Sequence, residues 1–329
     1  MRNMVGVGAV VFVLIALGAC SDESSDAGSG GAAGTDAGVG GQSSGGSAGT
    51  STGGSAGTST GGSAGTSTGG SAGSGGSAGT NTGGSGGSGG PWSPKPGLSW
   101  QWQLTGTIDE SVDVAMYDID LFETPQATIA SLQAKGRVVI CYFSAGSRED
   151  WRPDAADFAA ADYGKKLDNW PGENWLDVRS ANVRAIMKKR LDLAVSKGCD
   201  GVEPDNVDGQ SNDTGFPLTK QDQLDYDGFL ATEAHARGLS VGLKNALELV
   251  PDLVSQFDWA LNEECLSFSE CNLLKPFLDA QKAVFHVEYV DQSSQGAQKQ
   301  QSVCGNATIT GFSTLIKTWD LDAWRLPCP

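Results

Sequence analysis

The chain has 329 residues, 47 of them glycine, and a formal net charge of −17 at pH 7. An acidic surface of this kind repels nucleic acid and anionic lipid headgroups, so both are poor partners and a cationic ligand is a better one. Acidity also keeps exported proteins soluble, and it therefore identifies no ligand by itself.

Residues 1–20 have the pattern of an export signal. Arg2 supplies a positive charge, and the apolar run 5–17 is too short for a membrane span. The segment Leu17-Gly18-Ala19-Cys20 resembles a bacterial lipoprotein signal. That resemblance implies acylation of Cys20, and the Ser21 that follows it implies sorting to the outer membrane. The alternative is an ordinary secretory signal that contains a cysteine.

Residues 21–90 consist almost entirely of glycine, serine, alanine and threonine. The unit Gly-Gly-Ser-Ala-Gly-Thr-Ser-Thr repeats over residues 45–68. No unit has a large apolar side chain to bury, so we expect a disordered, flexible linker and not a packed repeat. A mean reach of about 45 Å would let an anchored domain act on polymer beyond its own membrane.

Residues 91–329 are sufficient for one domain with a sizeable core. Alternating or apolar segments that end in polar residues predict eight strands, at 99–104, 112–120, 138–143, 202–205, 239–244, 259–265, 283–290 and 309–316. Amphipathic segments between several strands predict helices, such as the one with an apolar stripe over 183–195. Three such helices end at a basic residue and a glycine: Lys135-Gly136, Lys197-Gly198 and Arg237-Gly238.

Alternation of strands with helices predicts a parallel sheet with right-handed crossovers. With eight strands, we expect an α/β fold of the (β/α)8 TIM-barrel type, a single catalytic domain over 91–329. An open, doubly wound sheet is the alternative. No Gly-x-Gly-x-x-Gly or Walker-type loop supports nucleotide binding.

The segment 201–208 has carboxylates where a strand buried on both faces should stay apolar. Asp205, Asn206 and Asp208 follow Val202. They stand at the C-terminal end of the predicted strand, which is the end that carries catalytic residues in a barrel. The alternative is a polar turn whose carboxylates cap the next helix.

Two carboxylates on different strands are the minimum requirement for glycoside hydrolysis. We expect Asp205 to be the nucleophile or stabiliser, because Asn206 can hold its ionised carboxylate by a hydrogen bond. Glu263 is the candidate acid, since it follows the apolar segment 259–261. Glu263 and Glu264 point to opposite faces of a strand, so only Glu263 is expected in the barrel mouth.

The other polar residues near strand ends are candidates for substrate binding. They are Asp118, Asp120, Tyr142, Ser144, Asn206, Asp208, Lys244 and Asn245, with Trp102 as a sugar-stacking candidate. Several have an alternative structural role. Asp118 and Asp120 can cap a helix, Trp102 can pack in the core, and Lys244 can form ion pairs with the acids.

Six cysteines remain besides Cys20, which allows up to three disulfides in an exported protein. Cys265 and Cys271 are the expected pair because they are close in sequence. Cysteine and histidine spacings give no zinc motif and the carboxylates no calcium loop, so we expect no metal and no cofactor. Both histidines lie away from the predicted strand ends, which argues against a Ser-His-Asp arrangement.

Six segments, in order, resemble the endo-α-1,4-polygalactosaminidase family of glycoside hydrolases. They are residues 100–104, 117–120, 141–146, 205–208, 243–245 and 262–265. The resemblance implies a TIM barrel that cleaves α-1,4-linked, partly deacetylated galactosamine polymers, with Asp205 and Glu263 as the catalytic residues. Glu203-Pro204 departs from the apolar or small residues expected there.

We therefore expect an exported, monomeric, endo-acting hydrolase of a cationic amino-sugar polysaccharide. It is expected as an outer-membrane lipoprotein or at the cell surface or outside the cell, with membrane contact through a lipid anchor only. The alternatives are a surface-anchored, non-catalytic carbohydrate-binding barrel and a barrel hydrolase for another glycan. The presence of both Asp205 and Glu263 favours the enzyme.

Overall fold

The computed structural model of the protein describes residues 90–329. The predicted signal at 1–20, its acylation site Cys20 and residues 21–89 of the predicted linker lie outside the described residues. Within residues 90–329, no helix has both the length and the hydrophobicity needed to cross a membrane.

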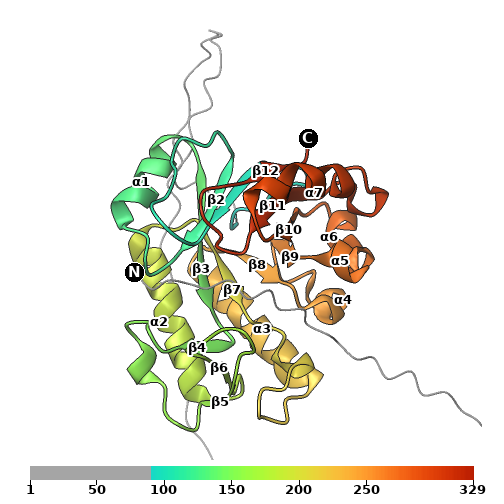
Figure 1. The fold of residues 1–329 in the computed structure, drawn as a ribbon. Coiled ribbons are helices and arrows are strands. Elements are labelled where there is room, and N and C mark those ends of the chain that lie inside the picture. The colour runs from blue at the N-terminus through green and yellow to red at the C-terminus, as the bar shows by residue number, and fades with distance from the viewer. Residues whose placement is uncertain (1–89) are drawn as a thin grey trace, which may run out of the picture. The chain divides into compact units, whose positions relative to one another are not determined.

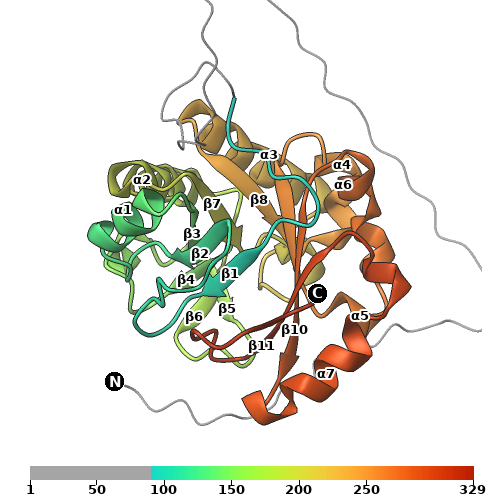
Figure 2. The same ribbon diagram turned by 90° about the horizontal axis from the view of Figure 1, so that it is seen from above.

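Eight parallel strands form the centre of the described region (Figure 1). In sheet order they are β1 (Trp100–Gln103), β2 (Met116–Asp120), β3 (Val138–Ser144), β7 (Gly201–Asp205), β8 (Ser240–Lys244), β9 (Trp259–Glu263), β10 (Val284–Val290) and β11 (Ser313–Thr318). A short β12 (Leu326–Pro327) pairs antiparallel with β11. The sheet curls around its interior and the helices lie outside it (Figure 2). The predicted TIM-barrel class is confirmed.

Helices connect the strands on the outside of the barrel. The α-helices are α1 (Gln126–Ala134), α2 (Ala181–Lys197), α3 (Lys220–Ala236), α4 (Val250–Leu253), α5 (Cys265–Phe268), α6 (Lys275–Asp279) and α7 (Gly296–Val303). Shorter 3₁₀ turns are η1 (Ala155–Asp157), η2 (Gly209–Ser211), η3 (Leu247–Leu249), η4 (Cys271–Leu274), η5 (Ser293–Gln295) and η6 (Ala307–Ile309).

Helix α2 shows how local sequence sets these boundaries. The Ser180 hydroxyl accepts hydrogen bonds from the backbone N–H groups of Asn182 and Val183, which caps the N-terminus. Gly198 ends the helix in the left-handed conformation, with φ of 86°. The predicted apolar stripe packs against the sheet except at Val195, which is exposed because it lies on the solvent side of the last turn.

A small second sheet interrupts the connection between β3 and α2. Its antiparallel strands are β4 (Ser147–Glu149), β6 (Glu173–Leu176) and β5 (Tyr163–Lys166), in that order. Figure 1 shows the three strands grouped beside α2. The sequence did not predict them, because each is short and rich in polar residues without a regular alternation.

Alternate residues of each barrel strand point inward, which is the two-residue period of a pleated strand. Near the N-terminal ends of the strands the barrel interior is apolar and aromatic, and one cluster there contains Trp100, Met116, Ile140, Trp259 and Phe285. Nearer the C-terminal ends, the inward positions become polar. This packed apolar layer therefore lies beneath a polar site at the mouth, where the strands end.

The first strand of the barrel, β1, is joined to the region of the last, β11, by hydrogen bonds that are not part of regular strand pairing. The indole Nε1 of Trp100 donates to the carbonyl of Ser313 at 2.9 Å. The backbone N–H of Leu104 donates to Leu321 O, also at 2.9 Å. The Gln101 side chain donates to Ala323 O at 2.9 Å. The segment after β11 thus fastens the first strand to the last.

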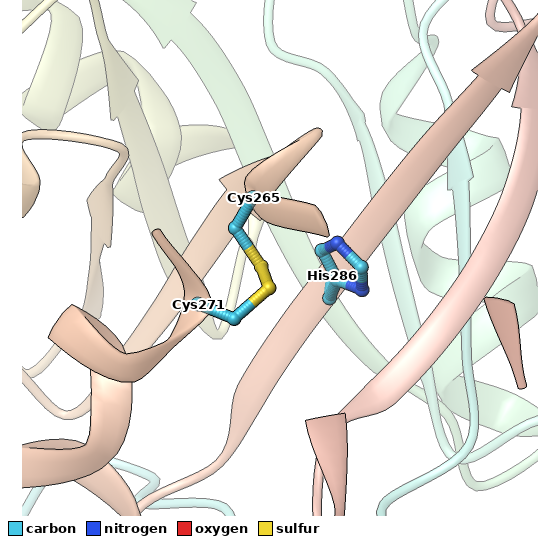
Figure 3. Close-up of side chains that lie close together, drawn as sticks. All are labelled: Cys265, Cys271 and His286. Atoms are coloured by element: carbon cyan, nitrogen blue, oxygen red, sulfur yellow. A yellow bond between two sulfur atoms is a disulfide. The ribbon is translucent and has the colours of Figure 1, made fainter. Parts of the chain in front are cut away.

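Three disulfides bind the described region together: Cys141–Cys199, Cys265–Cys271 and Cys304–Cys328. The pair expected from sequence proximity is present. Figure 3 shows His286 beside the Cys265–Cys271 bond. Because both sulfur atoms are used in that bond, they are not available as thiolate ligands for a metal ion.

Candidate active site

Asp205 is the last residue of β7, and three hydrogen-bond donors or cations surround its carboxylate. The backbone N–H of Asn206 donates to Oδ1 at 2.7 Å, and the Tyr142 hydroxyl donates to Oδ2 at 2.9 Å. Lys244 Nζ lies 3.2 Å from Oδ1. Both oxygens of the carboxylate are thereby held in place. The side chain is 18 % exposed, so a ligand in the mouth can reach it.

Glu263 is the last residue of β9 and has a comparable set of partners. The Tyr289 hydroxyl donates to Oε1 at 2.5 Å, and the Asn245 side-chain amide donates to Oε2 at 3.1 Å. Lys244 Nζ lies 3.3 Å from Oε2. Glu263 is 27 % exposed. The strand pleat thus brings Glu263 into the mouth.

Lys244 stands between the two carboxylates, at the end of the intervening strand β8. Because its Nζ touches Asp205 Oδ1 at 3.2 Å and Glu263 Oε2 at 3.3 Å, these oxygens are separated by no more than the sum of the two distances. Glycosidase carboxyl pairs are about 5–5.5 Å or about 6.5–9.5 Å apart, depending on mechanism. The pair is therefore close enough to act on one sugar.

Strands β7, β8 and β9 each end in the same local conformation. Asn206, Asn245 and Glu264, which directly follow the three charged residues, have φ of 60°, 47° and 59°. Left-handed residues turn the chain sharply after each strand, so the charged side chains stay at the rim. Gly146 is needed beside this rim, because a Cβ there would lie 1.6 Å from Asn206 O.

Glu203 lies one inward position below Asp205 on β7 and is fully buried. Its Oε1 is 3.0 Å from Lys244 Nζ, and its Oε2 accepts a hydrogen bond from Trp102 Nε1 at 3.1 Å. Burial and the charge on Asp205 raise the pKa of Glu203 to about 7, against the opposing effect of Lys244. Glu203, which departs from the pattern of the family that the sequence resembles, is thus the buried ion-pair partner of Lys244.

Asp118 lies beside Glu203, and neither of its carboxyl oxygens accepts a hydrogen bond from any donor within residues 90–329. A protonated Asp118 can instead donate to Glu203. Burial and the neighbouring Glu203 charge raise the pKa of Asp118 well above its usual range. Asp118 therefore retains its proton to a higher pH than an ordinary aspartate.

The charge of the site follows from these protonation states. Burial opposes the charge on Lys244, but Asp205, Glu203 and Glu263 raise its pKa well above the usual value, so it remains an ammonium. One cation thus faces Asp205, Glu263 and the partly ionised Glu203. The mouth carries net negative charge, which favours a cationic ligand.

Replacing Asp118 by asparagine should remove a pH-dependent cost to stability. The folded protein retains a proton that the unfolded chain releases above about pH 4. Wild-type stability should therefore fall as pH rises, whereas D118N escapes this loss. Its advantage in free energy of unfolding should grow with pH, with a limiting slope of about 1.4 kcal/mol per unit.

Urea unfolding of both proteins between pH 4.5 and 7.5 measures this difference. The control is Asp213→Asn, because Asp213 is an acid whose side chain is 79 % exposed. Its curve should run parallel to that of the wild type. A constant difference between D118N and wild type across the pH range would contradict a buried proton on Asp118.

Three expected substrate contacts are instead buried. Asp120 pairs with Arg152 at 2.6 Å, and its Oδ1 caps the N–H groups of Phe122 and Glu123. Trp102 is 1 % exposed and lies against Lys244 and Glu203, so it is no sugar platform. Asp118 is fully buried. For Trp102 the structural alternative, packing in the core, describes the protein. Asp120 holds the turn after β2 and does not cap helix α1, so the expected capping role is wrong. Asp118 has neither role.

Ser144 is also not available to a ligand. It is fully buried, and its Oγ accepts a hydrogen bond from the Asn206 side chain at 2.9 Å. It bonds Ser147 Oγ at 2.6 Å, which in turn donates to Glu173 at 2.5 Å. This chain of contacts holds the β7 turn against the inserted sheet, so Ser144 and Asn206 position Asp205.

Tyr142, Asn245 and Asp208 border the carboxylate pair. Tyr142 and Asn245 each bond one of the two carboxylates. Burial and the charge on Asp205 raise the pKa of Tyr142 well above its usual range, so the phenol remains a donor. Asp208 follows β7, and burial and the Asp205 charge raise its pKa to about 6.

The sequence did not predict that two aromatic residues stack on each other at the mouth of the barrel. They are Tyr289, the inward-facing residue near the end of β10, and Trp319, directly after β11. The structure stacks their rings with centroids 4.0 Å apart and planes 16° apart. No local signal identifies such a pair, because Tyr289 lies on β10 and Trp319 follows β11, about thirty residues later in the chain.

Comparison with protein families gives one match over the whole described region. A model described as glycoside-hydrolase family GH114 matches residues 84–329. Comparison with curated proteins gives no match.

This chain is similar to a number of solved structures, of which two are compared with it below. One is Aspergillus fumigatus Ega3 in complex with galactosamine, at 48% identity, with 72% of this chain and 97% of that chain covered and a TM-score of 0.69. The other is the glycoside hydrolase domain of PelA from Pseudomonas aeruginosa, at 13% identity, with 70% and 98% covered and a TM-score of 0.56. The second likeness concerns the fold alone.

Proposed function

The chain belongs to glycoside-hydrolase family GH114, and we propose that it is an exported, endo-acting hydrolase of α-1,4-linked galactosamine polymers. Asp205 and Glu263 form its catalytic pair in this proposal. The observation that carries the assignment is their joint contact with Lys244, which holds two partly exposed carboxylates of different strands within reach of one sugar.

Two independent observations support an amino-sugar substrate. The solved structure of Aspergillus fumigatus Ega3 contains galactosamine, and that protein is 48% identical to this chain. The mouth is also negatively charged, because three carboxylates face the single ammonium of Lys244. The protonated amine of a deacetylated galactosamine unit would be attracted to such a mouth.

In the proposed reaction the two carboxyl groups have different roles. Glu263 takes up a proton as substrate binds and donates it to the glycosidic oxygen as the bond breaks. Asp205 is ionised and attacks or stabilises the anomeric carbon. The hydrogen bonds to Asp205 hold its carboxylate at the mouth. One of them comes from the backbone N–H of Asn206, which keeps its place when side chains move.

Lys244 lies at the floor of this reaction centre. Before substrate binds, its ammonium offsets the repulsion between Asp205 and Glu263 and holds both in place. Glu203 and Trp102 fix Lys244 from below, through an ion pair at 3.0 Å and a ring whose centroid is 4.7 Å away. We assign Lys244 a positioning role and not a nucleophilic one.

Incubation with purified, partly deacetylated galactosaminan tests the proposal. Mass analysis should detect galactosamine oligomers of several lengths, the product pattern of an endo-acting enzyme. A non-catalytic carbohydrate-binding barrel would retain the polymer without producing new reducing ends. Cleavage of other glycans but not of galactosaminan would point to a different substrate.

The predicted location is at a membrane surface outside the cytoplasm, through a lipid on Cys20. The three disulfides within the described residues support folding in an oxidising compartment. Cys20→Ser should abolish incorporation of labelled palmitate and release the protein from the membrane fraction. Ser21→Ala, the matched control, should retain the label. An unlabelled wild type would indicate an ordinary secretory signal instead.

A further inference from the structure

Trp319 is an exposed indole at the mouth of the barrel. It directly follows β11, so it stands at the same C-terminal strand ends as the carboxylate pair. One of its faces stacks on Tyr289, with ring centroids 4.0 Å apart and planes 16° apart. Nevertheless 46% of the residue remains exposed. An indole with one face supported and the rest open to solvent is a flat surface of fixed orientation.

Exposure of a single tryptophan is ordinary on a protein surface and indicates no function by itself. The evidence for a role is the contact of Trp319, through Tyr289, with Glu263. The Tyr289 hydroxyl donates to Glu263 Oε1 at 2.5 Å. Burial and the charge on Glu263 raise the pKa of Tyr289 well above its usual range, which keeps this donor protonated. Only one phenol ring therefore separates the indole from the candidate acid.

The order of the strands indicates which side of the scissile bond Trp319 would serve. Around the rim, Asp205 ends β7, Lys244 ends β8 and Glu263 ends β9. Tyr289 on β10 and Trp319 after β11 follow in the same direction. Glu263 thus lies between Asp205 and the indole. Since the acid protonates the departing oxygen, the sugar that leaves lies on the indole's side.

We propose that Trp319 is the platform of a subsite for the amino sugar on the leaving-group side of the cleaved bond. This inference rests on the proposed function and names one binding site within it. The apolar face of the sugar ring stacks on the free face of the indole. The ammonium group of a galactosamine unit adds a cation–π attraction to the same ring.

Two substrates separate this role from a role on the other side of the bond. One is a defined galactosamine oligomer, and the other is the α-fluoride of a galactosamine oligomer, whose leaving group is a single atom. Trp319→Ala should lower kcat/KM for the oligomer about tenfold, as expected for loss of a ring-stacking and cation contact. Hydrolysis of the fluoride should change less than about twofold, because the subsite stays empty.

Control variants separate binding from structure. Trp319→Phe keeps an aromatic face and should restore most of the activity on the oligomer. Leu273→Ala removes an equally exposed apolar side chain, also 46%, from η4 on the outside of the barrel and should behave as wild type. If Trp319 acted only by holding Tyr289, the basic limb of the pH–rate profile, which reports loss of the proton from the general acid Glu263, would shift in Trp319→Ala, and the platform proposal would be wrong.

The remaining outcomes are also decisive. Equal losses on the oligomer and the fluoride would place the indole on the other side of the bond or in a structural role. Unchanged kinetics on both substrates would show that no sugar binds there. A wild-type protein inactive on both substrates would contradict the proposed function itself, which is a different failure from a normal wild type with an unaffected Trp319→Ala.

Discussion

Asp205→Asn should lower kcat on galactosaminan about 10⁴-fold, the scale seen when a residue of a catalytic group is removed. The amide keeps the shape of the carboxylate and can still accept the Asn206 hydrogen bond. It lacks the charge that attacks or stabilises the anomeric carbon. Substrate binding should therefore persist while release of reducing ends is lost, which a reducing-end assay and a binding assay on the same protein measure.

Glu263→Gln should have a distinct signature. Loss of a general acid costs about 10²–10⁴-fold on a natural glycosidic bond. A glycosyl fluoride needs no protonation of its leaving group, so bond cleavage in this substrate should be largely spared in Glu263→Gln but abolished in Asp205→Asn. The opposite pattern would exchange the roles assigned to the two residues.

The matched control for these variants is Asp213→Asn. Asp213 is an exposed acid in the connection between β7 and α3 and pairs with the exposed Lys165. The same change of carboxylate to amide there should leave kcat and KM unaltered. Activity of Asp205→Asn within tenfold of the wild type would contradict the assignment of Asp205, provided that an independent preparation gives the same value.

Lys244→Met should destabilise the fold and abolish activity together. The side chain is 2 % exposed and Glu203 is fully buried, so the substitution leaves a buried carboxylate without its cation. Breaking a buried pair in this way costs about 3–5 kcal/mol. It also leaves Asp205 and Glu263 repelling each other across the site. Denaturant unfolding and the reducing-end assay measure the two effects.

The stability loss in Lys244→Met should depend on pH in a defined direction. Burial already raises the pKa of Glu203 to about 7, and removal of the cation should raise it further. The folded variant then holds a proton that the unfolded chain releases near its ordinary pKa of about 4.3. Stability is therefore retained at low pH and lost as pH rises above that value.

Lys165→Met provides the comparison for Lys244→Met. Lys165 pairs with Asp213 at the surface, where both side chains are more than half exposed. Such pairs contribute about 0–1 kcal/mol, and the control should show little dependence on pH. Equal behaviour of the two variants would mean that Lys244 does not hold the site together.

The barrel and the position of Asp205 and Glu263 at its mouth could be predicted because their signals are local. Most of the parallel strands end in a polar residue, which is visible in any window of about ten residues. The pleat also predicted that Glu263, and not Glu264, enters the mouth. Asp205 and Glu263 stood out because a charge at the end of an apolar strand is costly unless it has a function.

The partners of these residues could not be predicted, because they come from distant parts of the chain. Asp120 was a candidate for substrate binding until the structure showed Arg152, from the insertion before α2, at its carboxylate. Glu203 looked like a departure from a family pattern, and only its contact with Lys244 explains it. The stacking of Trp319 on Tyr289 likewise depends on the closure of the barrel.

The fastening of β1 by the segment after β11 has a consequence for the order of folding. Leu321 O and Ala323 O accept hydrogen bonds from Leu104 N–H and from the Gln101 side chain, and Gln101 and Ala323 are 222 residues apart in the sequence. Contacts between such distant residues form slowly, because the entropy of closing a long loop must be overcome first. We therefore expect the contacts within each strand–helix unit to form early and the closure of the ring to be a late, rate-limiting event.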